Sequence, residues 1–239
     1  MLKKILSVVL SIAMTFTLFA CGSNSSISSD GSSSGGSASG GSNSDLRSQI
    51  ENLNSLTDTI KFGSDGSHEP IEWFILEDNG EKVLLLSKYV LTNKKYYDEN
   101  DSIEDLRVET WENSSLRKFL NSEFISSRFS KKEQKYILDT DIVNTIEYVD
   151  GKEQFGNTKD KVFLLNREEV EKYIYKRSDV DWGKETIPEL MAYVKNGDST
   201  AWWLRGTKIL WYVERNGKIF LESEEDSNYG VRPAMWVKY

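Results

Sequence analysis

The chain has 239 residues, a formal net charge of −8 and a single cysteine. Binding to the phosphates of a nucleic acid needs clustered lysine and arginine, and the sequence has no such cluster, so nucleic acid is not expected as a partner. One cysteine excludes an internal disulfide and any zinc site built from several cysteines. The fold must therefore be stabilised by its own core, for which the chain is long enough.

The first twenty residues have the pattern of a secretory signal peptide. Lys3 and Lys4 form a short positive region, residues 5–19 are apolar apart from serine and threonine, and a small residue, Ala20, precedes the expected cleavage point. This apolar run is shorter than the roughly 20 residues of a membrane-spanning helix. We therefore expect residues 1–20 to be removed.

Cys21 follows a Leu-Phe-Ala run and precedes Gly22, which is the arrangement of a lipobox, the cleavage and acylation signal of a bacterial lipoprotein. The alternative is an ordinary signal peptide with a chance cysteine. A cysteine that carries two or more acyl chains is a stable anchor. The pattern predicts lipidation at Cys21 and a location on the extracytoplasmic face of the cell membrane, with the lipid as the membrane contact.

Residues 21–44 are predicted to be a disordered tether, because 18 of the 23 residues that follow Cys21 are serine or glycine. Residues 45–59 differ in character. Leucine and isoleucine recur there every three or four residues, which predicts a short helical stalk. A helix this short is marginal by itself, so it either packs on the domain or frays.

Residues 60–239 are predicted to form one α+β domain. Three Asn-Gly or Asp-Gly pairs, at residues 79–80, 150–151 and 216–217, each separate two apolar runs. This is the strongest short signal for an antiparallel hairpin, because both residues tolerate positive φ. Residues 161–165 (Lys-Val-Phe-Leu-Leu) are predicted as a further strand.

Two or three short helices are expected between the hairpins. Apolar residues at helical spacing predict one over residues 116–124, with a cap among residues 113–115. Residues 130–133 and 166–169 (Ser-x-x-Glu and Asn-x-x-Glu) have the spacing of capping boxes and predict further helix starts. Residues 187–195 are predicted as one or two helical turns that end at a glycine. The strands and helices do not alternate as βαβ units, which gives the α+β class.

The sequence offers little for catalysis. Its one histidine, His68, stands in a glycine- and serine-rich turn, and no Gly-x-Ser-x-Gly elbow or phosphate-binding glycine motif is present. With 38 acidic residues, some pair of carboxylates is inevitable, so no pair is informative. The acidic stretches 98–101 and 222–226 lack the spacing of an EF-hand and are better explained as solvated turns. We therefore predict no enzyme activity, no cofactor and no metal site.

The aromatic residues say more. Trp202 and Trp203 are adjacent in a predicted strand, so their side chains point to opposite faces and both are buried only if a layer covers each face. The same holds for Trp211 and Tyr212. Either these rings all pack in the core, or one of each pair lines an exposed groove for a glycan or a protein. The residues predicted as ligand contacts are Trp182, Trp203, Tyr212 and Tyr229.

Five motifs follow one another along the chain: Pro-Ile-Glu-Trp at 70–73, Trp-Glu-Asn-Ser-Ser-Leu-Arg at 111–117, Val-Phe-Leu-Leu at 162–165, Trp-Trp-Leu-Arg at 202–205 and Gly-Val-Arg-Pro-Ala at 230–234. In this order they resemble a bacterial family of domains of unknown function, common in Gram-positive surface and secreted proteins. The resemblance covers about residues 60–239. It implies a surface location and carries no activity.

The last two motifs are also similar to the C-terminal part of formylglycine-generating-enzyme-like domains. Those domains have a C-type-lectin-like fold, so the similarity implies a single C-type-lectin-like domain here. The enzymes work through cysteines that residues 60–239 lack, and the Glu-Pro-Asn and Trp-Asn-Asp motifs of sugar-binding C-type lectins are absent. A fold alone does not assign a function.

The anchor, the tether and the aromatic-rich final third predict a non-enzymatic surface lipoprotein whose domain binds an extracellular glycan or protein. Two alternatives stay open. A hydrolase acting on cell wall or carbohydrate would need a cleft with two carboxyl groups roughly 5–10 Å apart. A surface scaffold or assembly module would show a large exposed apolar patch.

Overall fold

The computed structural model describes residues 43–53, 58–98, 110–148, 151–154, 156–176, 184–207, 209–222 and 227–239. The chain divides into two units, residues 1–38 and 39–239, and every described residue belongs to the second. Cys21, the tether up to residue 42 and Trp182 lie outside the described residues, so what was predicted for them stays a prediction.

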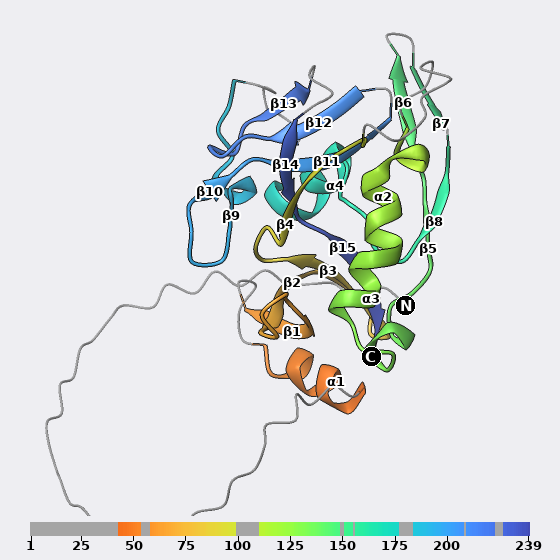
Figure 1. The fold of residues 1–239 in the computed structure, drawn as a ribbon, viewed down its shortest axis with the longest axis vertical. Coiled ribbons are helices and arrows are strands. Elements are labelled where there is room, and N and C mark those ends of the chain that lie inside the picture. Colours follow the sequence, from red (N-terminus) through yellow and green to blue (C-terminus); the bar gives the residue numbers. More distant parts are fainter. Residues whose placement is uncertain are drawn as a thin grey trace, which may run out of the picture. The chain divides into compact units, whose positions relative to one another are not determined.

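A four-stranded antiparallel sheet in the order β1-β2-β3-β15 forms one part of the core (Figure 1). Its strands are β1 (Thr59–Ser64), β2 (Pro70–Asp78), β3 (Lys82–Ser87) and β15 (Ala234–Lys238). Gly80 has a φ of 87° in the turn between β2 and β3, which confirms the first predicted hairpin. Residues 83–87 of β3 are all buried, so both faces of this strand are covered.

A second sheet has five strands in the order β13-β12-β11-β14-β4. They are β13 (Ile219–Glu222), β12 (Ile209–Val213), β11 (Trp202–Thr207), β14 (Asn228–Val231) and β4 (Thr92–Lys95). Strands β11 and β14 pair in parallel, and the other pairs are antiparallel. The predicted hairpin between β12 and β13 is confirmed. Gly217 turns it with a φ of 81°, at a point where a Cβ atom would lie 2.2 Å from the carbonyl oxygen of Ile187.

Three two-stranded ribbons complete the described strands: β5 (Thr140–Ile142) with β8 (Thr158–Asp160), β6 (Thr145–Tyr148) with β7 (Gly151–Gln154), and β9 (Ala192–Tyr193) with β10 (Ser199–Thr200). The β6–β7 ribbon is the predicted hairpin at residues 150–151. The helical turns predicted over 187–195 are confirmed in part. One 3-10 turn, η5 (Pro188–Leu190), begins at the proline, but it does not extend to residue 195, and Gly197 lies in the turn of the β9–β10 ribbon.

The helices that begin at Ser115 and Arg167 follow the predicted caps, whereas the helical turn at residues 111–113 was not predicted. The helices are all short. They are α1 (Asn43–Glu51), η1 (Trp111–Asn113), α2 (Ser115–Phe119), η2 (Leu120–Phe124), α3 (Ile125–Arg128), η3 (Glu133–Lys135), α4 (Arg167–Val170) and η4 (Glu171–Tyr175). The Ser114 side chain accepts from the backbone N–H of Arg117 and caps α2. Both predicted capping boxes, at residues 130–133 and 166–169, have their two reciprocal hydrogen bonds.

Residues 161–165 do not form the strand predicted for them. Their apolar side chains are buried, but their backbone groups pair with two different elements. Phe163 exchanges backbone hydrogen bonds with Ala234 of β15, whereas the carbonyls of Leu164 and Leu165 accept from Arg205 of β11. A strand ladder needs one continuous partner. This run instead bridges the two sheets, which explains an apolar pattern without strand geometry.

Helix α1 packs on the domain, which is one of the two outcomes expected for the stalk. Leu46 is 1% exposed and belongs to the core. Gln49 and Lys61 of β1 exchange two hydrogen bonds, and Arg47 donates to the carbonyl oxygen of Tyr239, whose ring lies 5.1 Å from the guanidinium carbon. The start of the folded part is therefore attached beside the C-terminal strand.

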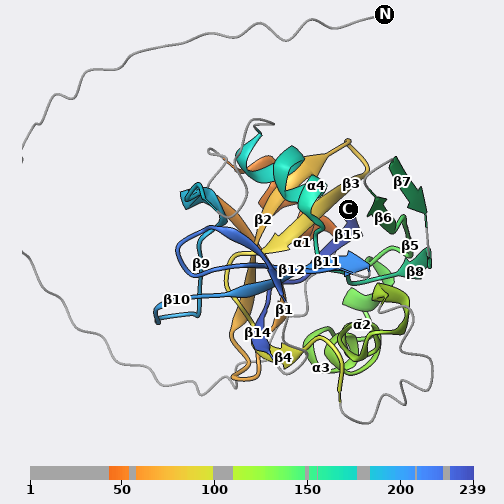
Figure 2. The same ribbon diagram turned by 90° about the horizontal axis from the view of Figure 1, so that it is seen from above.

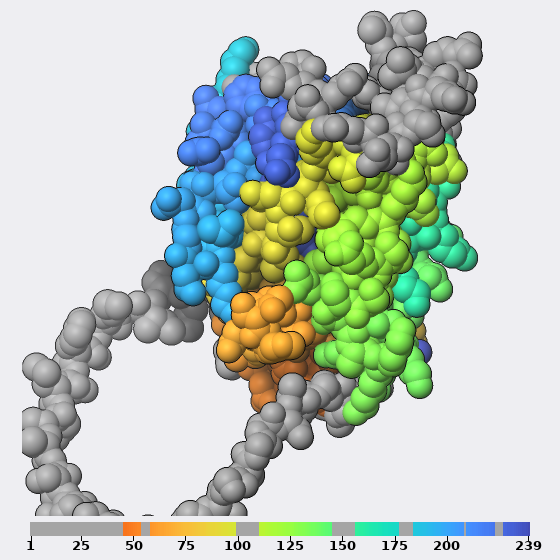
Figure 3. Space-filling view, in the orientation of Figure 1, coloured from red at the N-terminus to blue at the C-terminus, as the bar shows by residue number. Residues whose placement is uncertain are grey.

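The observed class is α+β, as predicted. Helices α2 and α3 lie on one side of β11 and α4 on the other (Figure 2). Figure 3 shows the segment around β4 between the β9–β14 region and the α2–α3 helices. Lys94 of β4 contacts helix α2, with its ammonium 4.4 Å from the ring centroid of Phe119. The largest fully buried side chains are tryptophans: Trp73, Trp111, Trp202 and Trp203.

Candidate functional site

Three of the four aromatic residues predicted as ligand contacts lie together on one face of the second sheet. The ring centroids of Tyr212 and Tyr229 are 4.5 Å apart, and those of Trp203 and Tyr229 are 4.7 Å apart. Phe220 of β13 stacks on the Tyr212 ring at 6.0 Å. We call Phe220, Tyr212, Tyr229 and Trp203 the aromatic row. The fourth predicted contact, Trp182, lies outside the described residues.

The rings of the aromatic row pack mainly against one another. Tyr212 stacks within 30° of parallel on both Phe220 and Tyr229. Trp203 is 1% exposed, and its indole N–H donates to the carbonyl oxygen of Lys94 at 2.8 Å. Burial raises the pKa of the Tyr212 and Tyr229 hydroxyls, so both are protonated at neutral pH. Ring edges and hydroxyl groups are what this row offers to a ligand.

The tryptophan pair and the Trp-Tyr pair behave differently. Trp202 and Trp203 are both buried, so layers cover both faces of β11. Trp211 and Tyr212 of β12 are half-buried on opposite faces. Trp211 faces α4, and the guanidinium carbon of Arg167 lies 4.8 Å from its ring centroid. Trp211, the member of this pair that faces α4, is not among the residues predicted as ligand contacts.

A buried arginine ties the start of α4 to β11. The side chain of Arg205 is 2% exposed, and its Nη2 donates to both carboxylate oxygens of Glu169 at 2.9 Å. Its Nη1 donates to Oδ1 of Asn144 at 3.2 Å, and its Nε donates to the carbonyl oxygen of Leu164 at 3.1 Å. Glu169 also closes the capping box with Asn166. The positive charge of Arg205 is therefore paired with Glu169, and each of its three guanidinium nitrogens donates a hydrogen bond.

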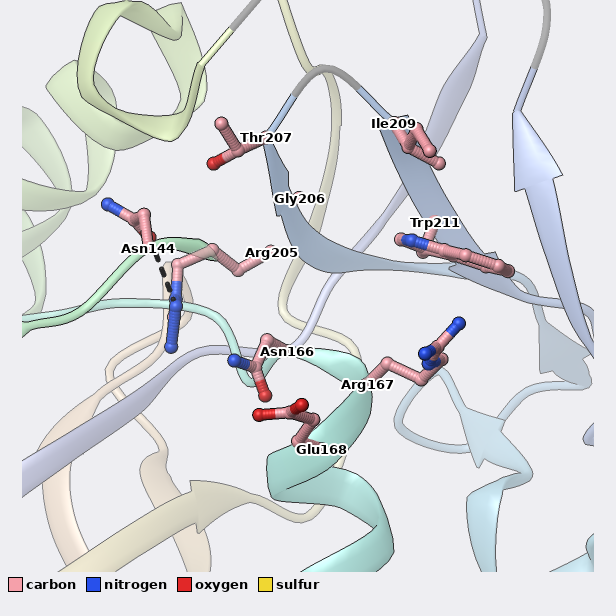
Figure 4. A pocket seen from close by; sticks show the side chains of 9 residues that line it. All are labelled: Asn144, Asn166, Arg167, Glu168, Arg205, Gly206, Thr207, Ile209 and Trp211. Atoms are coloured by element: carbon pink, nitrogen blue, oxygen red, sulfur yellow. Dashed lines mark hydrogen bonds between the residues drawn. The ribbon is translucent and has the colours of Figure 1, made fainter. Parts of the chain in front are cut away.

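A small pocket lies between this network, strands β11 and β12, and the start of α4 (Figure 4). We call it the α4 pocket; its volume is about 50 Å³. Its polar lining includes Asn144, Asn166, Arg167, Glu168 and Arg205, and its apolar wall is made by Trp211 and Ile209. Figure 4 shows the Arg167 guanidinium lying against the Trp211 ring.

A larger groove of about 390 Å³ adjoins the α4 pocket, and Asn166 and Glu168 line both. We call it the α4 groove. Its floor consists of three buried apolar residues, Leu84, Ile142 and Phe163. Its rim carries rings and charges of both signs: Asp141, Glu168, Lys172, Tyr173 and Trp236. Its volume lies within the ~300–1,000 Å³ of small-ligand pockets, whereas the α4 pocket holds only a group of a few atoms.

One wall of the groove is held by hydrogen bonds. The Tyr173 hydroxyl donates to Oε2 of Glu77 at 2.7 Å and accepts from Nζ of Lys172 at 2.6 Å. The hydrogen bond from Tyr173 and the nearby Lys172 ammonium hold the pKa of Glu77 below its ordinary value. Burial raises the pKa of Tyr173, and its hydroxyl raises the pKa of Lys172. At neutral pH the wall therefore presents the phenol of Tyr173 and the ammonium of Lys172, which the Glu77 carboxylate holds in place from outside the groove lining.

The sequence did not predict the groove rim. Its residues come from three parts of the chain, β5, α4 with η4, and β15, which carry no motif for binding. The only available signals were indirect. The capping box at 166–169 and the arginine of the Trp-Trp-Leu-Arg motif were both visible, but nothing in the sequence showed that Glu169 and Arg205 pair and thereby place α4 beside β11.

The remaining candidates lie elsewhere. His68 is exposed in a turn with a φ of 65°. Arg232 is buried, and its Nε donates to the carbonyl oxygen of Ser87 at 2.8 Å, which is a structural contact. Among the described residues, no group of three or more His, Cys, Asp or Glu side chains is placed to hold a metal ion. None of the described helices has the length and hydropathy needed to cross a bilayer.

Comparison with known proteins gives a family and no activity. Residues 80–239, about two thirds of the chain, match the family described as a domain of unknown function, DUF6273. No curated protein and no solved structure matches the chain. The match includes both sheets apart from β1 and β2, together with the α4 pocket and groove. The chain belongs to the DUF6273 family.

Proposed function

We propose that this chain is a lipoprotein anchored at Cys21 on the extracytoplasmic face of the cell membrane, and that its domain binds an extracellular glycan in the α4 groove without enzymatic activity. The N-terminal pattern of charged, apolar and small residues before Cys21 supports the anchor. The lining of the groove is the observation that carries the binding role. A C-type-lectin-like fold remains part of the proposal, as implied by the weaker resemblance.

The groove favours a glycan because its polar groups are mixed in sign. Glu168 and Asp141 accept hydrogen bonds, Lys172 donates them, and both kinds are needed by sugar hydroxyls. Half-buried rings of Tyr173 and Trp236 lie on the same rim. A lysine ammonium lies over one face of each ring, and the rest of the ring offers apolar area to the carbon face of a sugar. A protein ligand is the second candidate. The half-buried tyrosines of the aromatic row, Tyr212 and Tyr229, favour it, because tyrosine is enriched at protein interfaces.

The binding test compares one groove variant with one row variant. Trp236→Leu should weaken binding to a wall-derived oligosaccharide at least about tenfold, a change of about 1.4 kcal/mol in binding free energy. Tyr212→Leu, on the other sheet, should leave that binding unchanged. Calorimetric titration of the detergent-solubilised full chain measures both, after thermal unfolding has shown that each variant is folded.

The opposite pattern, loss of binding in Tyr212→Leu alone, would move the ligand to the aromatic row that the sequence predicts. Release of reducing ends from the oligosaccharide during the titration would favour the hydrolase alternative, for which the carboxylates of Asp141 and Glu168 on the rim are the candidates. Both outcomes are read from the same samples.

The anchor has a separate test. In cells fed a labelled fatty acid, the wild-type chain should carry the label and sediment with membranes. Cys21→Ala removes the acceptor thiol, so it should carry no label and should appear uncleaved or released into the medium. Labelling of the alanine variant would refute the lipobox and leave the binding proposal untouched.

A further inference from the structure

We propose that the α4 pocket receives the acetamido group of an N-acetylated sugar whose ring lies in the α4 groove. The inference rests on the proposed glycan-binding function and adds the ligand class to it. Because Asn166 and Glu168 line both the pocket and the groove, one ligand can place its ring in the groove and a short substituent in the pocket.

The size of the pocket selects a small substituent. A volume of about 50 Å³ is far below the ~300 Å³ or more of pockets that bury a whole small ligand. It exceeds the roughly 10–15 Å³ that a cavity needs to hold one water molecule. A group of a few heavy atoms fits this space, as an acetamido group does. A bare hydroxyl would leave much of the pocket unfilled, and unfilled space forfeits dispersion contacts.

The polar lining supplies a match for each polar atom of an acetamide. Asn166 uses its side-chain oxygen to cap α4 through the backbone N–H of Glu169, so the NH₂ group of this side chain is the part left to donate. Arg205 also lines the pocket, and its Nη1, which donates once to Asn144, has a second N–H group. These donors suit the acetamide carbonyl, and the exposed carboxylate of Glu168 suits its N–H group.

The apolar wall of the α4 pocket offers a contact to the methyl group of the acetamide. The Trp211 ring and the Ile209 side chain form one side of the pocket (Figure 4). Arg167 lies 4.8 Å from the centroid of the Trp211 ring and holds this ring in place. A carboxylate in the pocket would lie beside Glu168, with the charge of Arg205 already paired with Glu169, and an ammonium would lie beside two guanidinium groups. A neutral group with one donor, one acceptor and a methyl is the chemistry that fits all the walls.

The test uses three methyl glycosides that differ only at one substituent: N-acetylglucosamine, glucose and N-propanoylglucosamine. Titrations of the detergent-solubilised full chain should give an affinity for the N-acetyl sugar at least about tenfold above that for glucose, and a lower affinity for the larger N-propanoyl sugar. Trp211→Leu should remove this preference. Leu221→Ser should keep it, because Leu221 lies opposite Trp211 on β13 but does not line the pocket.

Equal affinity for glucose and N-acetylglucosamine would overturn this inference and leave the glycan-binding proposal standing. An unchanged preference in a folded Trp211→Leu variant would overturn it as well. Glucuronic acid is included as a fourth titration. A higher affinity for it than for N-acetylglucosamine would mean that the pocket receives a carboxylate and not an acetamido group. Binding of none of the four would defeat both proposals for these sugars.

Discussion

Asp160→Ala should lower the free energy of unfolding by about 3–5 kcal/mol, as expected when one partner of a buried ion pair is removed. The Asp160 side chain is 0% exposed and accepts three hydrogen bonds. The indole N–H of Trp111 donates at 2.8 Å, the hydroxyl of Thr158 at 2.7 Å and Nε of Arg117 at 2.7 Å. Alanine would leave these donors without their acceptor in the interior, where they lack compensating water.

Asp141→Ala is the matched control. Asp141 lies on β5, next to the residue that pairs with Asp160, and its side chain is 85% exposed beside Lys159 at 3.6 Å. An exposed pair contributes little, so this variant should stay within about 0.5 kcal/mol of wild type. Urea denaturation followed by tryptophan fluorescence measures both. Similar losses in the two variants would mean that burial of the Asp160 carboxylate does not determine its contribution.

The Asp160 network also shows which features local sequence patterns can predict and which they cannot. The turns and caps were predictable because each depends on residues two to four positions apart: the Asn-Gly and Asp-Gly hairpins formed, and both capping boxes closed. The motif at 111–117 was visible too, and its Ser114 cap was within the predicted range. Its partner Asp160 stands more than 40 residues later in a polar stretch with no pattern to mark it.

The α4 groove was unpredictable for a related reason. Its rim includes both Tyr173 and Trp236. The positions of these two residues relative to each other depend on how residues 161–165 run between the two sheets. Apolar periodicity shows that this segment is buried but not what its backbone bonds to. The predicted strand there was wrong because Arg205, a side chain from β11, takes the place of a neighbouring strand at the Leu164 carbonyl.

Trp203→Ala should cost about 3–5 kcal/mol, the usual loss for truncating a buried tryptophan. Trp203 is 1% exposed, its ring lies 5.4 Å from that of Tyr96 and 4.7 Å from that of Tyr229, and its N–H donates to Lys94. Alanine removes these contacts and leaves the Lys94 carbonyl without this donor, next to a cavity.

The companion variant, Tyr212→Ala, separates packing from binding in the same row. Tyr212 is half-buried, so its loss should cost less, about 1–3 kcal/mol. If the row only supports the sheet, the folded Tyr212→Ala chain binds its oligosaccharide with wild-type affinity, and the two variants differ in stability alone. If Tyr212 touches the ligand, as the sequence predicts, affinity falls in Tyr212→Ala while Tyr212→Phe retains part of it, because the ring stays and only the hydroxyl is lost. A Trp203→Ala variant as stable as wild type would contradict the packing role assigned to this indole.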